Sequence, residues 1–411
     1  MAEYRKDPKG RVLRKGENYR TKDHRYEYKY TDPLGKRKSI YANDLAELRK
    51  KEDDLKRDQL DGLKTYAEGN STINQAYDRY IKLKKNIRST TRANYDYLFD
   101  KYVRETFGKK KLSSIVTSDI KMFYNHLMEE VGLQVATIDS IHGILHPLFD
   151  MAVQDDVIRR NPTDGVMKEY KKANKPKKRL ALTRPQQKAF LEYVKDHKVY
   201  RKWHAVFVFM LGTGVRAGEL SAITWDDCDF EARVIHIRRN LVYDSLRKEQ
   251  GKEGNYSINE PKTSAGIRSI PMLDAVYDAL MEIREDQKAN GFNKTIIDGY
   301  SGFVFKNKDG NCLIDQNINK VIARIVDDYN NIEEIESAKQ KREPVLLPTF
   351  SCHILRHTFC CRLCEVEKNL KIIQSVMGHE NIETSLNIYA EATDDMKKES
   401  FDELSNKFYL F

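Results

Sequence analysis

The chain has 411 residues, of which 40% are hydrophobic, and its 72 Lys and Arg against 62 Asp and Glu give a formal net charge of +10. This composition excludes a collagen-like or largely disordered chain, and the length predicts two to four domains. The longest apolar run, within residues 205–215, is interrupted by glycines and is too short to cross a bilayer. No segment near the N-terminus resembles a signal peptide, and the six cysteines have no framework spacing. We therefore expect a cytoplasmic protein with no membrane partner.

Basic residues are concentrated in two segments. Residues 1–41 hold 13 basic and six acidic side chains, so this segment carries +7 of the net charge. A second cluster extends from Lys168 to Arg179, where seven basic side chains are opposed only by Glu169. A solvated face or a charged linker would give the same pattern. Two clusters at predicted domain edges nevertheless favour a partner with a phosphate backbone, and neither cluster has the broad apolar face of a membrane-binding helix.

Residues 1–68 predict a small basic three-stranded sheet followed by one helix. Residues 26–30 alternate tyrosine with charged side chains, which is the period of a half-buried strand. Residues 32–35 predict a turn and residues 39–41 a returning strand, and leucines recur at helical spacing after Asn43, the expected N-cap. We expect the tyrosine row to form the core of this domain, and the alternative is a platform for stacking bases.

Residues 70–167 show no convincing strand and predict a helical bundle. Apolar side chains recur at helical spacing in four stretches, within residues 73–80, 95–102, 120–127 and 138–149. His126, His142 and His146 are interpreted as packing or surface residues, and Asn161-Pro162 is expected to end the last helix. Residues 168–179 are predicted to be an exposed basic linker.

Residues 180–411 predict a mixed α/β domain that holds the chemistry. Strands are expected within residues 234–241, 266–271 and 302–305. The overall prediction is therefore a multidomain α+β protein, in which a small sheet is followed by a helical bundle and then by a larger α/β domain.

Two short motifs in this last part could bind phosphate, and each is weak evidence by itself. An apolar helix stops at Gly212 and Gly214, and Arg216 follows where a new helix should begin. A guanidinium there can direct two N–H groups at non-bridging phosphate oxygens, although a capped helix with one surface Arg looks the same. Residues 261–271 predict a hairpin with Lys262 near its tip, and one Lys among many basic residues is uninformative by itself.

Two further motifs follow along the chain. His353 and Arg356 are three residues apart, so they share one face of a helix, and this pair suits a phosphate ester whose leaving group needs a proton. In isolation, two polar residues on a solvated helix are the more common explanation of such a pair. Gly378 is expected to close one helix, with His379 in the break and Tyr389 ten residues later near the end of the next helix.

Taken together, the order Arg, Lys, His-x-x-Arg, Gly-His, Tyr across residues 216–389 resembles the tyrosine recombinase family of lambda-type integrases. Every catalytic position of that family is filled here. The helical region resembles the family's core-binding domain, and the basic N-terminal sheet resembles the arm-binding domain of integrases from conjugative transposons. The differences are Met377, where the family usually has Leu, and a polar stretch at residues 327–343 that resembles an insertion.

The resemblance implies a site-specific recombinase that integrates and excises a mobile genetic element. Tyr389 would attack the scissile phosphorus, leaving a 3′-phosphotyrosine and a free 5′-hydroxyl. Arg216 and Arg356 would neutralise the charge that develops on the phosphorus, so neither a metal nor a cofactor is expected.

The other implied roles concern protons and orientation. Lys262 would protonate the departing 5′-oxygen, His353 would serve as general base or hydrogen-bond partner of the nucleophile, and His379 would donate to a phosphate oxygen. Glu219, one turn after Arg216, is expected to orient these groups.

The resemblance also implies partners. The chain would bind double-stranded DNA at core and arm sites, act as a homotetramer on DNA with a small basic excision factor, and associate with the bacterial nucleoid. The residues expected to contact DNA are basic side chains of the two charged segments: Arg11, Arg14, Arg20, Arg25, Lys36, Arg37, Lys38, Lys172, Lys177, Lys178 and Arg179. Residues 391–411 are expected to form a tether and an amphipathic tail helix that docks on a neighbouring protomer, the alternative being packing on its own domain.

Two other functions compete with this interpretation, and the cysteines raise a separate question about zinc. A type IB topoisomerase shares the catalytic residue types but reseals the same strand. A DNA-binding regulator with an inactive recombinase fold would lack cleavage. Cys360, Cys361 and Cys364 with the nearby histidines could suggest zinc, but adjacent cysteines rarely bind one metal, so we expect them to pack behind Arg356.

Overall fold

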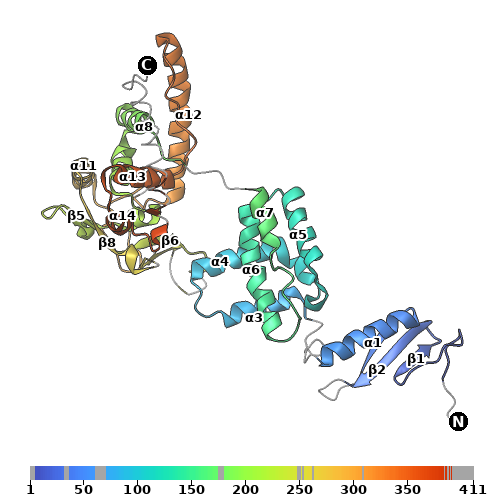
Figure 1. Cartoon of the computed structure of the whole chain (residues 1–411). Helices are drawn as coiled ribbons and strands as arrows, with labels where there is room; N and C mark the ends of the chain where they lie inside the picture. Colours follow the sequence, from blue (N-terminus) through green and yellow to red (C-terminus); the bar gives the residue numbers. More distant parts are fainter. Residues whose placement is uncertain are drawn as a thin grey trace. The chain divides into compact units, whose positions relative to one another are not determined.

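The computed structural model of the chain describes residues 5–31, 37–60, 71–174, 180–247, 251, 254–261, 263–307, 310–383, 385–386, 388 and 390, with only the backbone of 58–60. The chain divides into two compact units, residues 1–176 and 177–411 (Figure 1). The multidomain α+β prediction is confirmed. The predicted turn at 32–35, part of the basic linker and the predicted tail at 391–411 lie outside the described residues.

A three-stranded antiparallel sheet of order β1-β2-β3 opens the first unit, with strands Glu17–Arg20, Arg25–Thr31 and Arg37–Ala42. Helix α1 (Leu45–Leu60) packs on one face of the sheet. Tyr26 is buried in the core between sheet and helix and Tyr28 packs against it, so the prediction that the tyrosine row is core is confirmed for these two tyrosines. The helix is capped by Asp44 rather than Asn43, since the Asp44 carboxylate accepts from the Ala46 amide at 2.9 Å.

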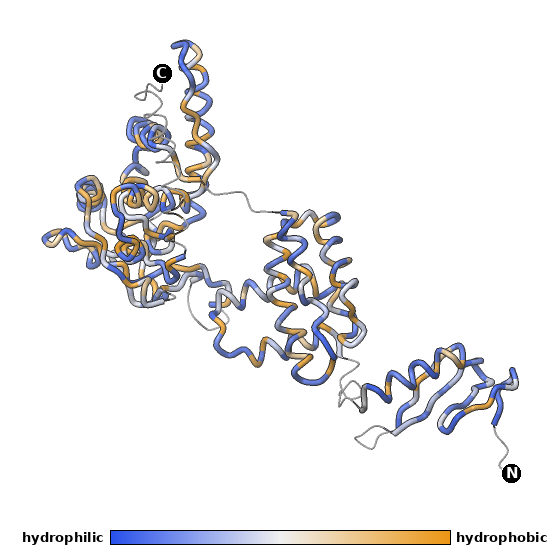
Figure 2. The backbone as a smooth tube through the Cα atoms, viewed as in Figure 1, coloured by the Kyte–Doolittle hydropathy of each residue, from blue (hydrophilic) through white to orange (hydrophobic). Residues whose placement is uncertain are grey.

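In residues 71–174, five α-helices follow: α3 (Ile73–Leu83), α4 (Ser89–Phe99), α5 (Thr117–Glu129), α6 (Val135–Gln154) and α7 (Val166–Ala173). Short π and 3-10 turns lie between α4 and α5. The apolar stretches that predicted four helices supply one continuous hydrophobic core. Figure 2 shows hydrophobic residues gathered inside this bundle, whereas the strands of the N-terminal sheet are largely hydrophilic.

The start of the predicted basic linker is wrong, because residues 168–173 belong to α7. Val166 and Met167 are buried in the bundle core and Tyr170 packs against it, so a narrow apolar stripe holds the helix in place. Lys171 pairs with Asp139 of α6 at 2.8 Å. The density of lysines hid the stripe in the sequence. The last helix accordingly does not end at Asn161-Pro162, since α6 ends at Gln154 and α7 follows.

The second unit is built around α9 (His204–Thr213), which is buried on nearly all sides. Its neighbours are α8 (Arg184–Asp196), α11 (Asp274–Asn290) and α13 (Cys352–Val366). Short α10 (Ala217–Ala222) and α14 (Leu370–Met377) lie near the ends of these helices, and long α12 (Asp315–Gln340) extends away from the body of the unit (Figure 1). The polar stretch 327–343 lies mainly in the outer half of α12.

Two small sheets complete the second unit. One has the order β4-β5-β8 (Cys228–Asp229, Val234–Ile237, Arg268–Pro271), and the other pairs β6 (Asn240–Tyr243) with β7 (Tyr256–Asn259). The strand predicted at 234–241 is thus two strands, and residues 302–305 make only an isolated bridge between Phe303 and Thr224.

The predicted hairpin at 261–271 is wrong. Strand β8 pairs with β5 rather than with β7, and residues 264–266 form a short 3-10 turn between them. Ile235 and Ile237 of β5 and Ile270 of β8 lie on the same face of the β5–β8 pair, and all three are buried. Burial of this apolar face against residues distant in the sequence decides the pairing.

Candidate active site

Arg216 is positioned by the end of α9. The helix closes at Gly214 with a φ of 61°, where an added Cβ would lie 2.2 Å from the Phe359 ring, so the close approach requires glycine. Arg216 then stands directly before α10 with extended backbone. Its side chain is 41% exposed, and its Nη2 donates to the Gly378 carbonyl oxygen at 3.0 Å.

Arg356 reaches the same place from α13. It is only 4% exposed, and its Nη1 donates to the Gly214 carbonyl oxygen at 2.6 Å while its Nη2 donates to the Met377 carbonyl oxygen. The carbonyls of two consecutive residues, Met377 and Gly378, therefore bind Arg356 and Arg216, which fixes the two guanidinium groups side by side.

His379 follows directly on this turn. Gly378 ends α14 in the left-handed conformation, as the sequence predicts, and the ring of His379 is 8% exposed. Its Nδ1 lies 2.9 Å from the Ser385 hydroxyl, which orients the ring. The structure thus brings Arg216, Arg356 and His379 together from three separate parts of the sequence.

Glu219 binds two arginines at once. Its carboxylate accepts from the Arg216 amide at 2.9 Å and from Arg216 Nη1 at 2.6 Å, and these two contacts hold the Arg216 side chain in place. Arg268 of β8 donates to both carboxylate oxygens, from Nη2 at 2.8 Å and from Nη1 at 3.1 Å. Arg268 was not among the predicted site residues, although its spacing of two from Ile270 on β8 puts both side chains on the core face.

The cluster carries excess positive charge, because Arg216, Arg268 and Arg356 lie together and Glu219, which binds two of them, is the acidic group among them. Burial raises the pKa of Glu219, but the hydrogen bonds and charge of Arg268 and the charge of Arg216 outweigh it and lower the pKa to about 2. Burial lowers the pKa of Arg356 to about 9, with Arg216 acting in the same direction, so Arg356 stays protonated at neutral pH. Burial and the charges of Arg356 and Arg216 lower the pKa of His379 to about 4, which leaves its imidazole neutral. Such a site favours an anion.

Of the other three predicted catalytic residues, the structure describes only His353. His353 is exposed on α13, one turn before Arg356. Lys262 and Tyr389 lie outside the described residues. Ile388 packs against the small core of α13 and α14 that includes Cys360, Cys361 and Cys364. All three cysteines are buried in that core, consistent with packing rather than zinc binding.

Within the described part of the chain, one group of side chains has metal-ligand spacing: His146, Asp150 and Asp164 of the helical bundle. The amide of Asn161 already donates to Asp150 at 2.7 Å and lies 2.9 Å from His146 Nδ1. His146 and Asp150 therefore already have hydrogen-bond partners within the bundle, and we interpret the group as part of that hydrogen-bond network.

The basic residues of the N-terminal sheet divide between its two faces. Residues directly opposite in an antiparallel pair share a face, so the pairs Arg20–Arg25 and Thr31–Arg37 lie on the face away from α1. Arg20 and Arg25 both lie over the Tyr41 ring, with centroid distances of 5.2 and 5.6 Å. The register pairs Lys38 with Tyr30, on the other face.

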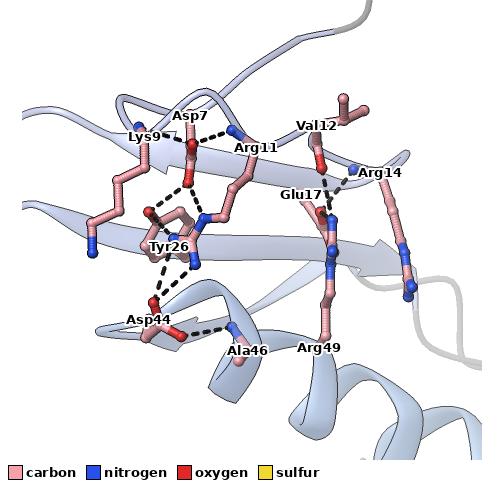
Figure 3. Close-up of polar contacts among 10 residues, drawn as sticks. All are labelled: Asp7, Lys9, Arg11, Val12, Arg14, Glu17, Tyr26, Asp44, Ala46 and Arg49. Atoms are coloured by element: carbon pink, nitrogen blue, oxygen red, sulfur yellow. Dashed lines mark hydrogen bonds and ion pairs between the residues drawn. The ribbon is translucent and has the colours of Figure 1, made fainter.

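Arg11 is already engaged within the domain (Figure 3). Its Nε donates to the buried Asp7 carboxylate at 2.8 Å, and its Nη atoms reach Asp44 and the Tyr26 hydroxyl. Asp7 also accepts from Tyr26 at 2.8 Å, which ties the N-terminal segment to the sheet and α1. Arg11 thus has a structural place that its position in a basic segment did not reveal.

A second carboxylate holds the same segment (Figure 3). The fully buried Glu17 side chain accepts from the Arg14 amide at 2.7 Å and from Arg49 Nε at 2.9 Å. Only the backbone of Arg14 takes part in this contact, and its side chain is exposed, as is that of Lys172 on α7. The remaining predicted DNA contacts, Lys36, Lys177, Lys178 and Arg179, lie outside the described residues.

None of the helices in the described ranges is long and apolar enough to span a bilayer.

Three segments of the chain match known protein families. Residues 181–396 match the phage integrase family, residues 1–59 match the DNA binding domain of Tn916 integrase, and residues 72–128 match the N-terminal SAM-like domain of phage integrases. The transposase from transposon Tn916 of Enterococcus faecalis and that from transposon Tn1545 of Streptococcus pneumoniae are each 32% identical to the chain over 408 residues. In both cases the match covers 96% of this chain and 95% of the relative.

Solved structures agree with these matches. A Tn1549 transposon integrase in complex with a circular intermediate DNA has a TM-score of 0.69 at 32% identity, covering 80% of this chain and 99% of that one. A lambda integrase dimer bound to a core site shares the fold with a TM-score of 0.52 at 18% identity. Since the family match covers more than half of the chain and the relatives match nearly all of it, this chain belongs to the phage integrase family of tyrosine recombinases.

Proposed function

We propose that the chain integrates and excises a conjugative transposon by cutting and rejoining DNA through a 3′-phosphotyrosine on Tyr389. The observation that carries this proposal is the convergence of Arg216, Arg356 and His379 on the turn 377–379, in a site with excess positive charge. Two of the five N–H groups of Arg216 bind Glu219 and Gly378, so others remain for a phosphate oxygen.

The chemistry follows from these groups. Negative charge grows on the non-bridging oxygens as Tyr389 Oη attacks, and fixed guanidinium groups stabilise that charge without reorganisation. His379 is neutral, so an N–H of its ring can donate to an oxygen without adding charge. Lys262 would give its proton to the departing 5′-oxygen, and His353 would accept the proton of the nucleophile.

The proposed partners are two kinds of DNA site, further copies of the chain and an excision factor. The face of the N-terminal sheet that bears Arg20, Arg25 and Arg37 would bind the arm-type sites, and the helical bundle with the second unit would bind the core sites. Strand exchange between two duplexes would need four protomers on DNA. A small basic excision factor would set the direction of the reaction in the bacterial cytoplasm, at the nucleoid.

The test is strand exchange between two duplexes that carry the joined ends of the element encoding the chain. We expect recombinant strands in which the label of one duplex is joined to the other, and their loss in Tyr389→Phe with DNA binding retained. Resealing of the same strand only would favour a type IB topoisomerase. Binding without any cleavage by the unmodified chain would favour a DNA-binding regulator.

A further inference from the structure

Arg268 lies at the centre of the active-site cluster without facing solvent. It is 7% exposed, and besides its two bonds to Glu219 its Nε donates to the Val376 carbonyl oxygen at 2.7 Å and its Nη1 to the Gly266 carbonyl oxygen at 3.2 Å. One side chain therefore joins three elements: β8 on which it stands, the start of α10, and the end of α14.

Those contacts hold Arg216 and Arg356, the two arginines that are proposed to bind the phosphate. On one side, Arg268 fixes the Glu219 carboxylate, which in turn binds the amide and Nη1 of Arg216. On the other side, Val376 directly precedes Met377 and Gly378, whose carbonyls bind Arg356 and Arg216. The turn also packs on Arg268 itself, because a Cβ added to Gly378 would lie 3.0 Å from its Cδ and Nη1.

The charge of Arg268 has a second effect. Glu219 is 3% exposed and would otherwise be neutralised by Arg216 alone. Because Arg268 shares the carboxylate as a buried, two-pronged ion pair, less of the positive charge of Arg216 is cancelled, and its exposed side chain remains available to an anion.

We propose that Arg268 is a positioning residue for phosphoryl transfer, which acts through Glu219 and the turn 376–379 to hold Arg216, Arg356 and His379 in their reactive arrangement. The proposal rests on the proposed function. It predicts that Arg268 governs the rate of strand cleavage and has little effect on DNA affinity, since it does not reach the surface.

The test uses the full chain and a nicked duplex that carries the joined ends of the encoding element, from which the covalent adduct cannot be religated. Arg268→Lys keeps the charge but cannot bind both oxygens of Glu219 and Val376 O together. We expect the rate of adduct formation at saturating DNA to fall by roughly 10- to 100-fold, while the Kd for DNA stays within about twofold.

The matched control is Arg342→Lys. Arg342 binds both oxygens of Glu333 at 2.5 and 2.8 Å, in the same two-pronged arrangement, but the pair is at the outer end of α12. This variant should form the adduct at the rate of the unmodified chain. If both substitutions slow adduct formation equally, the loss of any such ion pair slows the reaction, and the proposal would be overturned.

A double-substitution cycle separates positioning from general damage. If Arg268 acts through Glu219, Arg268→Lys combined with Glu219→Gln should slow adduct formation about as much as the more severe single variant. If the double variant is slowed by the product of the two single-variant factors, the two residues act independently, and the proposal would be contradicted. If Arg268→Lys does not fold, Glu219→Gln alone weakens the same ion pair between Arg268 and Glu219. An unchanged rate of adduct formation in that variant would also contradict the proposal.

The controls also separate this proposal from the proposed function. If the unmodified chain forms no adduct, the proposed function fails. If it forms the adduct and Arg268→Lys reacts at the same rate, only the positioning role of Arg268 fails.

Discussion

The imidazole of His379 is buried beside three guanidinium groups, and this environment disfavours its charged form. Burial is the larger cause, and the charges of Arg356 and Arg216 add to it. Between pH 6.5, the ordinary pKa of His, and about 4, the unfolded chain therefore binds a proton at this residue that the folded chain does not. Above pH 6.5 His379 is neutral in both states, so it does not make the free energy of unfolding depend on pH. As the pH is lowered from 6.5 to about 4, the free energy of unfolding decreases because of this residue.

We predict that His379 titrates with a midpoint near pH 4 in the DNA-free protein. Histidine-selective NMR, assigned by comparison with a His379→Gln variant, measures this midpoint directly. A midpoint for His379 at or above 6.5 would mean that the ring is not buried among these arginines.

At this scale the sequence predicted part of the site. Motif order grouped Arg216, Arg356 and His379, and the structure places these three residues around the turn 377–379. Arg268 was missed and Arg11 was assigned to DNA, because a basic side chain in a sequence does not show which carboxylate it meets. The partners Glu219 and Asp7 are set by tertiary packing.

Among the secondary-structure elements, the N-terminal sheet presents arginines on its open face. Arg20 and Arg25 are directly opposite one another, and Asp23 lies near both, at 3.4 and 2.7 Å, which relieves their repulsion. Arg11, by contrast, is tied to Asp7 and Asp44 at the edge of the same domain. These two environments predict opposite effects of the same substitution.

We predict that Arg25→Ala weakens binding of the arm-type site and lowers the slope of log K against log salt by about one, with the Tm unchanged. Arg11→Ala should lower the Tm of the N-terminal domain, because Asp7 would be left buried without its cation. Salt-dependent binding isotherms and thermal melts of both variants make the comparison. The reverse assignment, with Arg11 setting the salt slope, would contradict the placement of these side chains.

Among the secondary-structure elements, the amphipathic helices were predicted best, because the spacing of their apolar residues is set within a short stretch of sequence. The apolar stretches of α3 to α6 matched the buried residues of the bundle. The pairing of β8 with β5 and the helical state of residues 168–173 were not predicted, since both depend on burial against distant residues such as Ile235 and the bundle core.

At the scale of the whole molecule, separate parts would bind separate DNA sites. We predict that deletion of residues 1–68 spares binding and cleavage at the crossover site and abolishes binding of the second, arm-type site. Gel-shift measurements with each site alone, at several salt concentrations, test this. Retained arm binding by the shortened chain, or no DNA binding by the isolated segment at low salt, would refute the assignment.

Assembly is the second prediction at this scale. Phe401, Leu404, Phe408 and Phe411 form one apolar stripe in the sequence of the C-terminal segment, which lies outside the described residues. Phe401→Ala with Phe408→Ala should leave single-site binding intact and reduce tetramer assembly and recombination, as measured by gel shift and native mass spectrometry. Unfolding of the monomer with unchanged assembly per bound protomer would indicate packing on its own domain.

The central claim is that Tyr389 attacks a phosphate held by arginines, and mapping the covalent adduct tests it most directly. The chain is incubated with a nicked duplex of the joined element ends in excess chelator, digested with protease, and the modified peptide is sequenced by mass spectrometry. We predict a 3′-phosphate linked to Tyr389, formed without divalent cations because Arg216 and Arg356 supply the positive charge. An adduct on any other of the 23 tyrosines, or cleavage only when Mg²⁺ or Zn²⁺ is restored, would contradict the account.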